Sequence, residues 1–299
     1  MKNQNEVSSM KTSKEMREEI KILQIEELNG MKTYLKLADM VKDSENKKVL
    51  KRIAVEEKKH YDIWKTYTDE DIKPNKLKIQ FFYFLSRIFG LTFGIRLMEL
   101  GEADAQKAYE KIIKQIPEAE KVMKEEETHE ELLIDMLDEE SLNYAGSVVL
   151  GLNDALVELT GALAGLTFAF QNTRVIALAG LITGISASFS MAASEYLSKK
   201  SEEDDQDPMR SAVYTGIAYI FTVFLLVAPF LLTSNYYLSL AWTIVNAIIV
   251  IAGFNYYISV ARGYNFRRRF LEMASISLGV ALFSFILGNL IRIWLGVDI

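Results

Sequence analysis

The chain has 299 residues, with 34 Lys and Arg against 40 Asp and Glu, two His and no Cys, and half of it is hydrophobic. Residues 1–140 hold 25 basic and 30 acidic side chains, whereas residues 141–299 hold 9 and 10. This asymmetry excludes a single soluble globule, and the absence of Cys excludes disulfides, thiolate zinc sites and iron–sulfur clusters. Mild acidity of mixed sign also argues against a nucleic-acid partner. We therefore predict an all-α chain of two domains, 1–140 and 141–299.

The first domain shows no strand alternation and predicts four helices. We expect these helices at residues 13–41, 44–68, 78–115 and 117–137. Asp43-Ser44 and Pro117 are typical of helix starts, and Pro74 is typical of a break. The polar residues 1–14 lack the apolar segment of a signal peptide, so this half is expected to stay in the cytoplasm.

Both histidines of the chain lie in this domain, and each follows a Glu by three residues. The segments are Glu57-Lys-Lys-His60 and Glu126-Glu-Thr-His129, and Glu27 and Glu102 lie on the other two predicted helices, each seven residues before a Tyr. The repeated spacing indicates a duplicated helical hairpin, hence a four-helix bundle with twofold pseudosymmetry. One Glu from each of two helices and Glu-x-x-His from each of the other two form the ligand set of a di-iron carboxylate centre.

The predicted metal ligands are Glu27, Glu57, His60, Glu102, Glu126 and His129. Glu26 and Glu56 remain rivals in a shifted register, although the repeated spacing favours Glu27 and Glu57. We expect Glu26, Glu56, Glu125 and Glu127 on the solvent-exposed surface. The expected metal is Fe, with Mn as the alternative. On these residues the domain resembles the rubrerythrin branch of the ferritin-like superfamily, which implies a ferritin-like fold. The peroxidase activity of that branch is not expected, because it uses a Cys-rich electron-transfer domain.

Residues 79–100 are apolar enough to suggest a membrane span, but they contain Arg87, Arg96 and Glu99. Charges in a bilayer core are costly. We therefore expect an amphipathic segment that lies against the membrane or a partner subunit.

The second domain contains five apolar stretches, each long enough for a helix to cross a bilayer. They cover residues 144–170, 175–197, 211–232, 237–260 and 273–295. The two longer connecting loops carry most of the Lys and Arg, so the positive-inside rule places them in the cytoplasm. Five spans then put the N-terminal domain inside and the C-terminus outside, with the plasma membrane as the expected location.

Acidic side chains within these stretches are functional candidates, because an acid in lipid is costly. Asp154 and Glu158 are four residues apart on the first span, and Met191 and Glu195 are four apart on the second. Each pair shares a helix face, and the small residues around them let the two helices approach closely. Carboxylates with one thioether suit Fe²⁺ or Mn²⁺.

The segments Gly151-Leu-Asn-Asp-Ala-Leu-Val-Glu158 and Ser190-Met-Ala-Ala-Ser-Glu-Tyr196 resemble the first two helices of the vacuolar iron transporter family. The resemblance implies export of Fe²⁺, often Mn²⁺, from the cytosol, with proton exchange in some members and a homodimeric assembly. It implies Asp154 and Met191 as pathway ligands, with Glu158 and Glu195 assisting. Eukaryotic members carry a Glu-rich helical insert after the second span, which is short here, so another part of the chain is expected to collect the metal.

Taken together, the chain resembles the membrane-bound ferritin type, a rubrerythrin domain joined to an iron-transporter domain. The predicted function is export of Fe²⁺ or Mn²⁺, with a cytoplasmic di-iron domain that collects or senses the metal. The alternatives are a ferroxidase or di-iron oxidoreductase that the spans merely anchor, and a metal-responsive regulator without transport.

Overall fold

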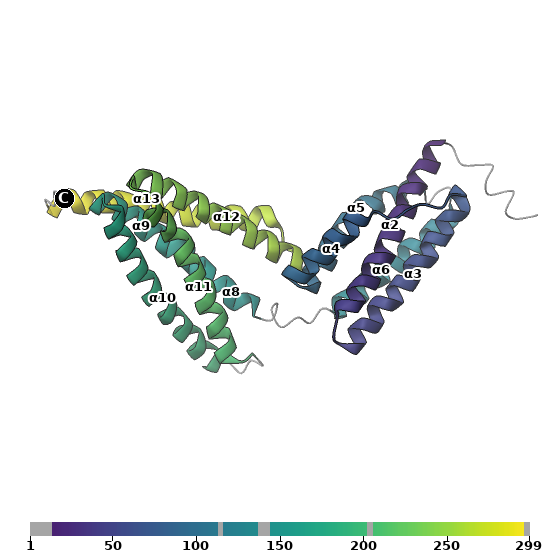
Figure 1. Ribbon diagram of the computed structural model, residues 1–299, viewed down its shortest axis with the longest axis horizontal. Coiled ribbons are helices and arrows are strands. Elements are labelled where there is room, and N and C mark those ends of the chain that lie inside the picture. The colour runs from purple at the N-terminus through teal and green to yellow at the C-terminus, as the bar shows by residue number, and fades with distance from the viewer. Residues whose placement is uncertain (1–13, 113–115, 137–143, 202–205, 296–299) are drawn as a thin grey trace, which may run out of the picture. The chain divides into compact units, whose positions relative to one another are not determined.

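The computed structural model describes residues 14–112, 116–136, 144–201 and 206–295, and all the regular structure in them is helical. The chain divides into two compact units, Met1–Glu139 and Glu140–Ile299. The described helices form a bundle in the first unit and five long apolar helices in the second (Figure 1). The predicted all-α class is therefore confirmed.

The N-terminal unit begins with a long antiparallel helix pair. Its helices are α2 (Lys14–Met40), α3 (Ser44–Thr68), α4 (Lys76–Phe89), α5 (Leu91–Ile112) and α6 (Pro117–Met136). The side chain of Asp43 caps α3 by accepting the backbone N–H groups of Glu45 and Asn46 at 3.0 and 2.8 Å. Such a cap satisfies donors that the first helical turn leaves unpaired. The short connection between α2 and α3 makes the two helices run side by side in opposite directions.

The single helix predicted over residues 78–115 is wrong, because the chain breaks at Gly90 into α4 and α5. Gly90 has φ 96° and ψ 156°, a backbone conformation that favours glycine. The two helices then fold back on each other, since a Cβ at Gly94 would lie 3.0 Å from the Cα of Ser86. In one straight helix these two positions would be about 12 Å apart. Residues 113–115, at the predicted end of that helix, lie outside the described residues.

Helix α4 runs alongside α2 in the same direction. Near its start, the Asn75 backbone N–H donates to the side chain of Asn29 at 2.8 Å, and further on the Lys36 ammonium lies 4.4 Å from the centre of the Tyr83 ring. Because α5 reverses direction at Gly90, it runs antiparallel to α2 and parallel to α3. The inner face of α4 joins the same core as α2, α3, α5 and α6, through residues that include Tyr34, Leu50, Ile53, Phe82, Ile95 and Leu133.

The C-terminal unit supplies five helices long and apolar enough to cross a membrane, and the protein is an integral membrane protein. The candidate spans are Ala145–Phe170, Thr173–Ser201, Pro208–Leu232, Tyr236–Arg262 and Phe266–Trp294. Within them lie α8 (Ala145–Asp154), η1 (Ala155–Leu159), α9 (Thr160–Phe170), α10 (Thr173–Ser201), α11 (Pro208–Leu232), α12 (Tyr236–Arg262) and α13 (Phe266–Leu295). The described residues of the N-terminal unit contain no candidate span.

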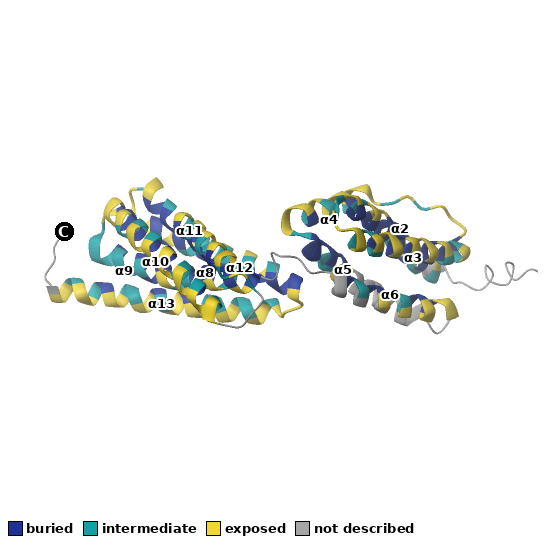
Figure 2. Cartoon of the chain, turned by 90° about the horizontal axis from the view of Figure 1, so that it is seen from below, coloured by how far each residue is buried: buried dark blue, intermediate teal, exposed yellow. Residues whose placement is uncertain are grey.

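Outward-facing positions of these spans carry large apolar side chains, as a lipid environment requires. Figure 2 shows exposed residues along the helices of this unit. Examples are Leu178, Phe189, Phe221, Ile249 and Phe283, all more than half exposed. The interior is built around η1, α9 and α11, where Leu156, Leu163, Tyr219 and Phe230 are fully buried. Without a hydrophobic driving force between helices in lipid, close backbone approach stabilises such packing.

Candidate functional site

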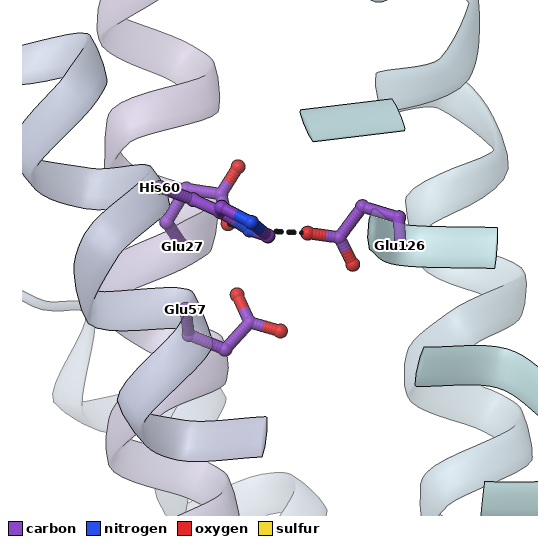
Figure 3. A group of neighbouring side chains, drawn as sticks. All are labelled: Glu27, Glu57, His60 and Glu126. Carbon is purple, nitrogen blue, oxygen red and sulfur yellow. Dashed lines mark ion pairs between the residues drawn. The ribbon is translucent and has the colours of Figure 1, made fainter. Parts of the chain in front are cut away.

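Four predicted ligands converge between three helices of the N-terminal unit. Glu27 comes from α2, Glu57 and His60 from α3, and Glu126 from α6 (Figure 3). One ligand atom from each of the four lies within 4.8 Å of the others. Glu27, Glu57 and His60 are at most 5% exposed. The i, i+3 spacing on α3 places Glu57 and His60 on one face.

The carboxylate of Glu126 lies between the two imidazoles. Its Oε1 is 2.7 Å from Nδ1 of His60, and its Oε2 is 3.4 Å from Nδ1 of His129. The rings of His60 and His129 are stacked with centroids 5.6 Å apart. Glu57 Oε1 lies 3.8 Å from Nδ1 of His129. The Glu of each Glu-x-x-His segment is thus close to the His of the other segment.

The outward-facing nitrogen of each imidazole is held by a further Glu. Nε2 of His60 donates to Glu125 at 2.9 Å, and Nε2 of His129 donates to Glu56 at 2.7 Å. We expected Glu56 and Glu125 on the solvent-exposed surface, but both are partly buried against the histidines. The sequence marks them only by their position directly before the Glu of a Glu-x-x-His segment, which does not distinguish them from surface acids. Glu26, in contrast, pairs with Lys78.

Glu27 is fixed by an indole that sequence reasoning missed. Nε1 of the fully buried Trp64 donates to Glu27 Oε1 at 3.0 Å, and Glu27 Oε2 lies 3.6 Å from Nδ1 of His60. This hydrogen bond leaves the second oxygen directed at the cluster. Gly30 on α2 makes room for Glu57, since a Cβ there would meet Glu57 Oε2 at 3.2 Å.

The carboxylates keep the imidazoles protonated. Burial lowers the pKa of His60, but Glu126 and Glu27 outweigh it and raise that pKa from 6.5 to about 10. Burial also lowers the pKa of His129, yet Glu126 and Glu56 raise it above its ordinary value. For Glu126, burial raises the pKa, while His129 and His60 pull it well below the usual range. Protonated His60 therefore offsets part of the buried carboxylate charge, and the pKa of His129 is shifted in the same direction.

The donor set fits divalent metal. Nδ1 of His60, Nδ1 of His129 and Oε1 of Glu126 are buried and make no hydrogen bond of good geometry within the described part of the chain, despite their short separations. Buried polar atoms normally have such partners. These three atoms are therefore available to a metal ion, which would replace the Nδ1 protons of the two imidazoles. Glu102 lies on α5, but its side chain is outside the described residues.

In the membrane unit, Asp154 directly precedes an irregular turn and Glu158 lies within it. Residues Ala155–Leu159 form a π-helical turn, which the sequence did not predict. Such turns are frequent at functional sites. Asp154 is half-buried, whereas Glu158 is exposed and accepts a hydrogen bond at 2.9 Å from Tyr219, a fully buried residue of α11.

The second pair of candidates lies on α10. Glu195 is buried and accepts a hydrogen bond at 2.7 Å from Ser147 of α8, which ties the end of the second span to the start of the first. Met191 packs against the core of the unit. Among the described residues, Asp154, Glu158 and Glu195 do not form a group close enough to share one ion.

Comparison with protein families finds a match for the first two candidate spans. Residues 145–207, which cover α8 to α10 and the start of the following connection, match the VIT family. This match contains Asp154, Glu158, Met191 and Glu195. The searches of curated proteins and of solved structures gave no match. The N-terminal helices with their buried Glu and His cluster carry no family match.

Proposed function

We propose that this protein exports Fe²⁺ or Mn²⁺ from the cytosol and that its N-terminal unit binds the same metal. One observation carries the proposal: a VIT family segment spanning residues 145–207 shares a chain with a buried cluster of Glu and His. The VIT match suggests iron or manganese transport, and the cluster offers the carboxylate and imidazole donors that these ions accept.

The N-terminal cluster is proposed as a di-metal centre held by Glu27, Glu57, His60, Glu102, Glu126 and His129. Glu57 and Glu126 would each serve both halves of the site, because each is close to the imidazole of the opposite segment. A bound Fe²⁺ pair would supply redox capacity at this place. The residues themselves position the ions, with Trp64, Glu56 and Glu125 holding the ligands from outside.

In the membrane unit we propose that the ion passes Glu195 and then Asp154 and Glu158, with Met191 as a soft ligand. The excess of Lys and Arg in the two longer loops favours a cytoplasmic N-terminal unit and an outward path. Carboxylates that release a cation can take up protons, so export by proton antiport is consistent with this set of side chains.

A homodimer explains the environment of Glu158. This acid lies within a span and is exposed in the single chain, although an acid facing lipid is costly. A second copy over this face would cover it and bring a second set of acids to the path. This assembly would supply the ligands that one chain does not gather.

The test is metal flux into proteoliposomes. Asp154→Asn, which keeps the shape of the side chain but removes its charge, is expected to abolish Fe²⁺ and Mn²⁺ flux. Glu120→Gln, at an exposed acid of α6 outside the candidate spans, is the control and should transport normally. Wild-type flux in Asp154→Asn would overturn the transport proposal. Flux lost equally in the control would show only general damage to the protein.

The second candidate function is a membrane-anchored ferroxidase, which the buried cluster alone would also support. Oxygen consumption with Fe²⁺ separates the two functions. In a pure ferroxidase, His60→Ala stops oxygen consumption and Asp154→Asn has no effect on any measured activity. In a metal-responsive regulator, neither flux nor oxygen consumption is observed with the wild type.

A further inference from the structure

Helix α4 has an apolar face that no described residue of its own unit covers. Leu77, Phe81, Phe84 and Ile88 are spaced at i, i+4, i+7 and i+11, so they form one stripe along the helix. Their exposed fractions are 84, 55, 58 and 55%. The opposite face, with Ile79, Phe82 and Ser86, is buried. The helix is therefore packed on one side and unpartnered on the other.

The sequence segment that carries this stripe has charges of one sign, and Glu26 of α2, an acid of another helix in contact with it, pairs with Lys78 among the described residues. No Asp or Glu occurs from residue 72 to residue 98, although the first 140 residues contain 30 acids. The same segment contains five basic residues, Lys73, Lys76, Lys78, Arg87 and Arg96. Lys73, Lys76 and Arg87 are exposed. Exposed large apolar side chains bordered by cations, on a short helix, match the chemistry of an anionic lipid surface.

We propose that α4 docks on the membrane, with Leu77, Phe81, Phe84 and Ile88 at the acyl boundary and the flanking cations on anionic lipid headgroups. A short segment joins the N-terminal unit to the membrane unit, because the first candidate span begins at Ala145, nine positions after α6 ends at Met136. With 14 residues, α4 is too short to cross a bilayer, which needs about 20.

A second copy of the same face is a poorer occupant on electrostatic grounds. In a twofold interface the same patch meets itself, so the cations of one helix would face those of the other. No acid on this segment could offset them. An anionic leaflet, in contrast, supplies the opposite charge and an apolar interior together.

Docking would hold the metal cluster at the leaflet surface. The buried face of α4 shares its core with α2, α3 and α5, and α2 and α3 carry Glu27, Glu57 and His60. A helix fixed on the lipid would thereby fix the bundle that holds these ligands. This consequence depends on the proposed function, but the docking itself does not.

The absence of Cys allows a direct test on the full chain. Phe84→Cys, labelled with an environment-sensitive nitrobenzoxadiazole fluorophore, is reconstituted into vesicles of phosphatidylcholine with phosphatidylglycerol. Ile22→Cys on α2 and Val55→Cys on α3 are matched controls, being 59 and 58% exposed. We expect blue-shifted emission at position 84 and strong quenching by lipids that carry a spin label near the headgroup, with little quenching at positions 22 and 55.

The charge requirement is tested in the same vesicles. Replacing Lys73, Lys76 and Arg87 together by Gln should reduce the quenching at position 84, as should phosphatidylcholine alone. Quenching at position 84 no stronger than at the controls overturns the proposal. A second result would also overturn it. If a bifunctional maleimide efficiently cross-links two copies of the unlabelled Phe84→Cys variant, and lipids do not quench the labelled variant, then a second copy covers the stripe. Equal quenching in neutral and anionic vesicles would refute the role of the cations.

Discussion

At the residue scale, the carboxylates outside the metal ligands are open to a direct test. We expect Glu56→Gln and Glu125→Gln each to weaken metal binding by about 10- to 100-fold, the usual cost of losing a partner of a ligating imidazole. Glu56 accepts from His129 and Glu125 from His60. Affinity for Co²⁺, followed by calorimetry and by its visible spectrum, provides the measurement.

The matched control for these variants is Glu120→Gln on α6, whose exposed carboxylate pairs only with Lys124 among the described residues. Its affinity for Co²⁺ should be that of the wild type. If all three variants bind equally well, the two Glu contacts do not position the imidazoles.

The ionisation of the imidazoles predicts how metal binding depends on pH. The pKa of His60 is about 10 without metal, so at neutral pH the ion must displace its proton, and His129 behaves in the same sense. Affinity should therefore rise with pH, by about tenfold per unit for each imidazole that must lose a proton. Calorimetry in two buffers of different ionisation enthalpy counts the released protons. An affinity constant between pH 6.5 and 8 that does not change would contradict this prediction.

The raised pKa of His60 also determines how the stability of the metal-free N-terminal unit depends on pH. The stabilising contribution of the His60 ion pairs is fully present below pH 6.5, the ordinary pKa, and is lost as pH rises through about 10. Bound metal removes this dependence, because it replaces the proton. Fluorescence of Trp64, which donates to Glu27, reports on the loosening of the cluster.

At the element scale, the packing of α9 on α13 depends on two glycines. A Cβ at Gly288 would lie 2.4 Å from the backbone oxygen of Gly165, too close to be accommodated without a shift of the helices. Gly288→Ala should therefore lower stability by about 1 to 3 kcal/mol. Gly279→Ala on the same helix is the control, since nothing lies within 4 Å of a Cβ there. Thermal unfolding in detergent measures both, and equal midpoints would refute the packing argument.

The sequence predicted most elements because their signals are local. Asp43 before α3, Pro117 at the start of α6 and the long apolar stretches define helices through caps, breakers and hydropathy. The break at Gly90 was missed because helical periodicity continues on both sides of it. What reverses the chain there is the tertiary contact between Ser86 and Gly94.

The convergence of Glu27, Glu57, His60 and Glu126 was predictable from the repeated spacing. The partners of these ligands were not. Trp64 of α3 donates to Glu27 of α2, and Glu56 and Glu125 each contact the imidazole of the opposite segment. In an acid-rich sequence a Glu beside a ligand has no pattern of its own, and only the packing of α3 against α6 distinguishes it from a surface residue.

At the scale of the whole molecule, the question is what the bundle contributes to transport. If the cluster collects metal for the spans, it raises the local supply without changing the path itself. His60→Ala with His129→Ala should then raise the apparent KM for Fe²⁺ flux and leave the maximal rate unchanged. A sensor that gates the spans would instead change the maximal rate, because its occupancy would decide how many molecules conduct.

Flux in proteoliposomes over a range of Fe²⁺ concentrations separates these two roles. Glu45→Gln, at an exposed acid in the first turn of α3, is the control and should alter neither parameter. Docking of α4 adds a further condition, since a collected ion is useful only if the cluster stays near the membrane. The triple Gln variant of Lys73, Lys76 and Arg87 should therefore raise the apparent KM in anionic vesicles while its affinity for metal in solution stays unchanged. An unchanged KM in both sets of variants would mean that the bundle and the spans handle metal independently.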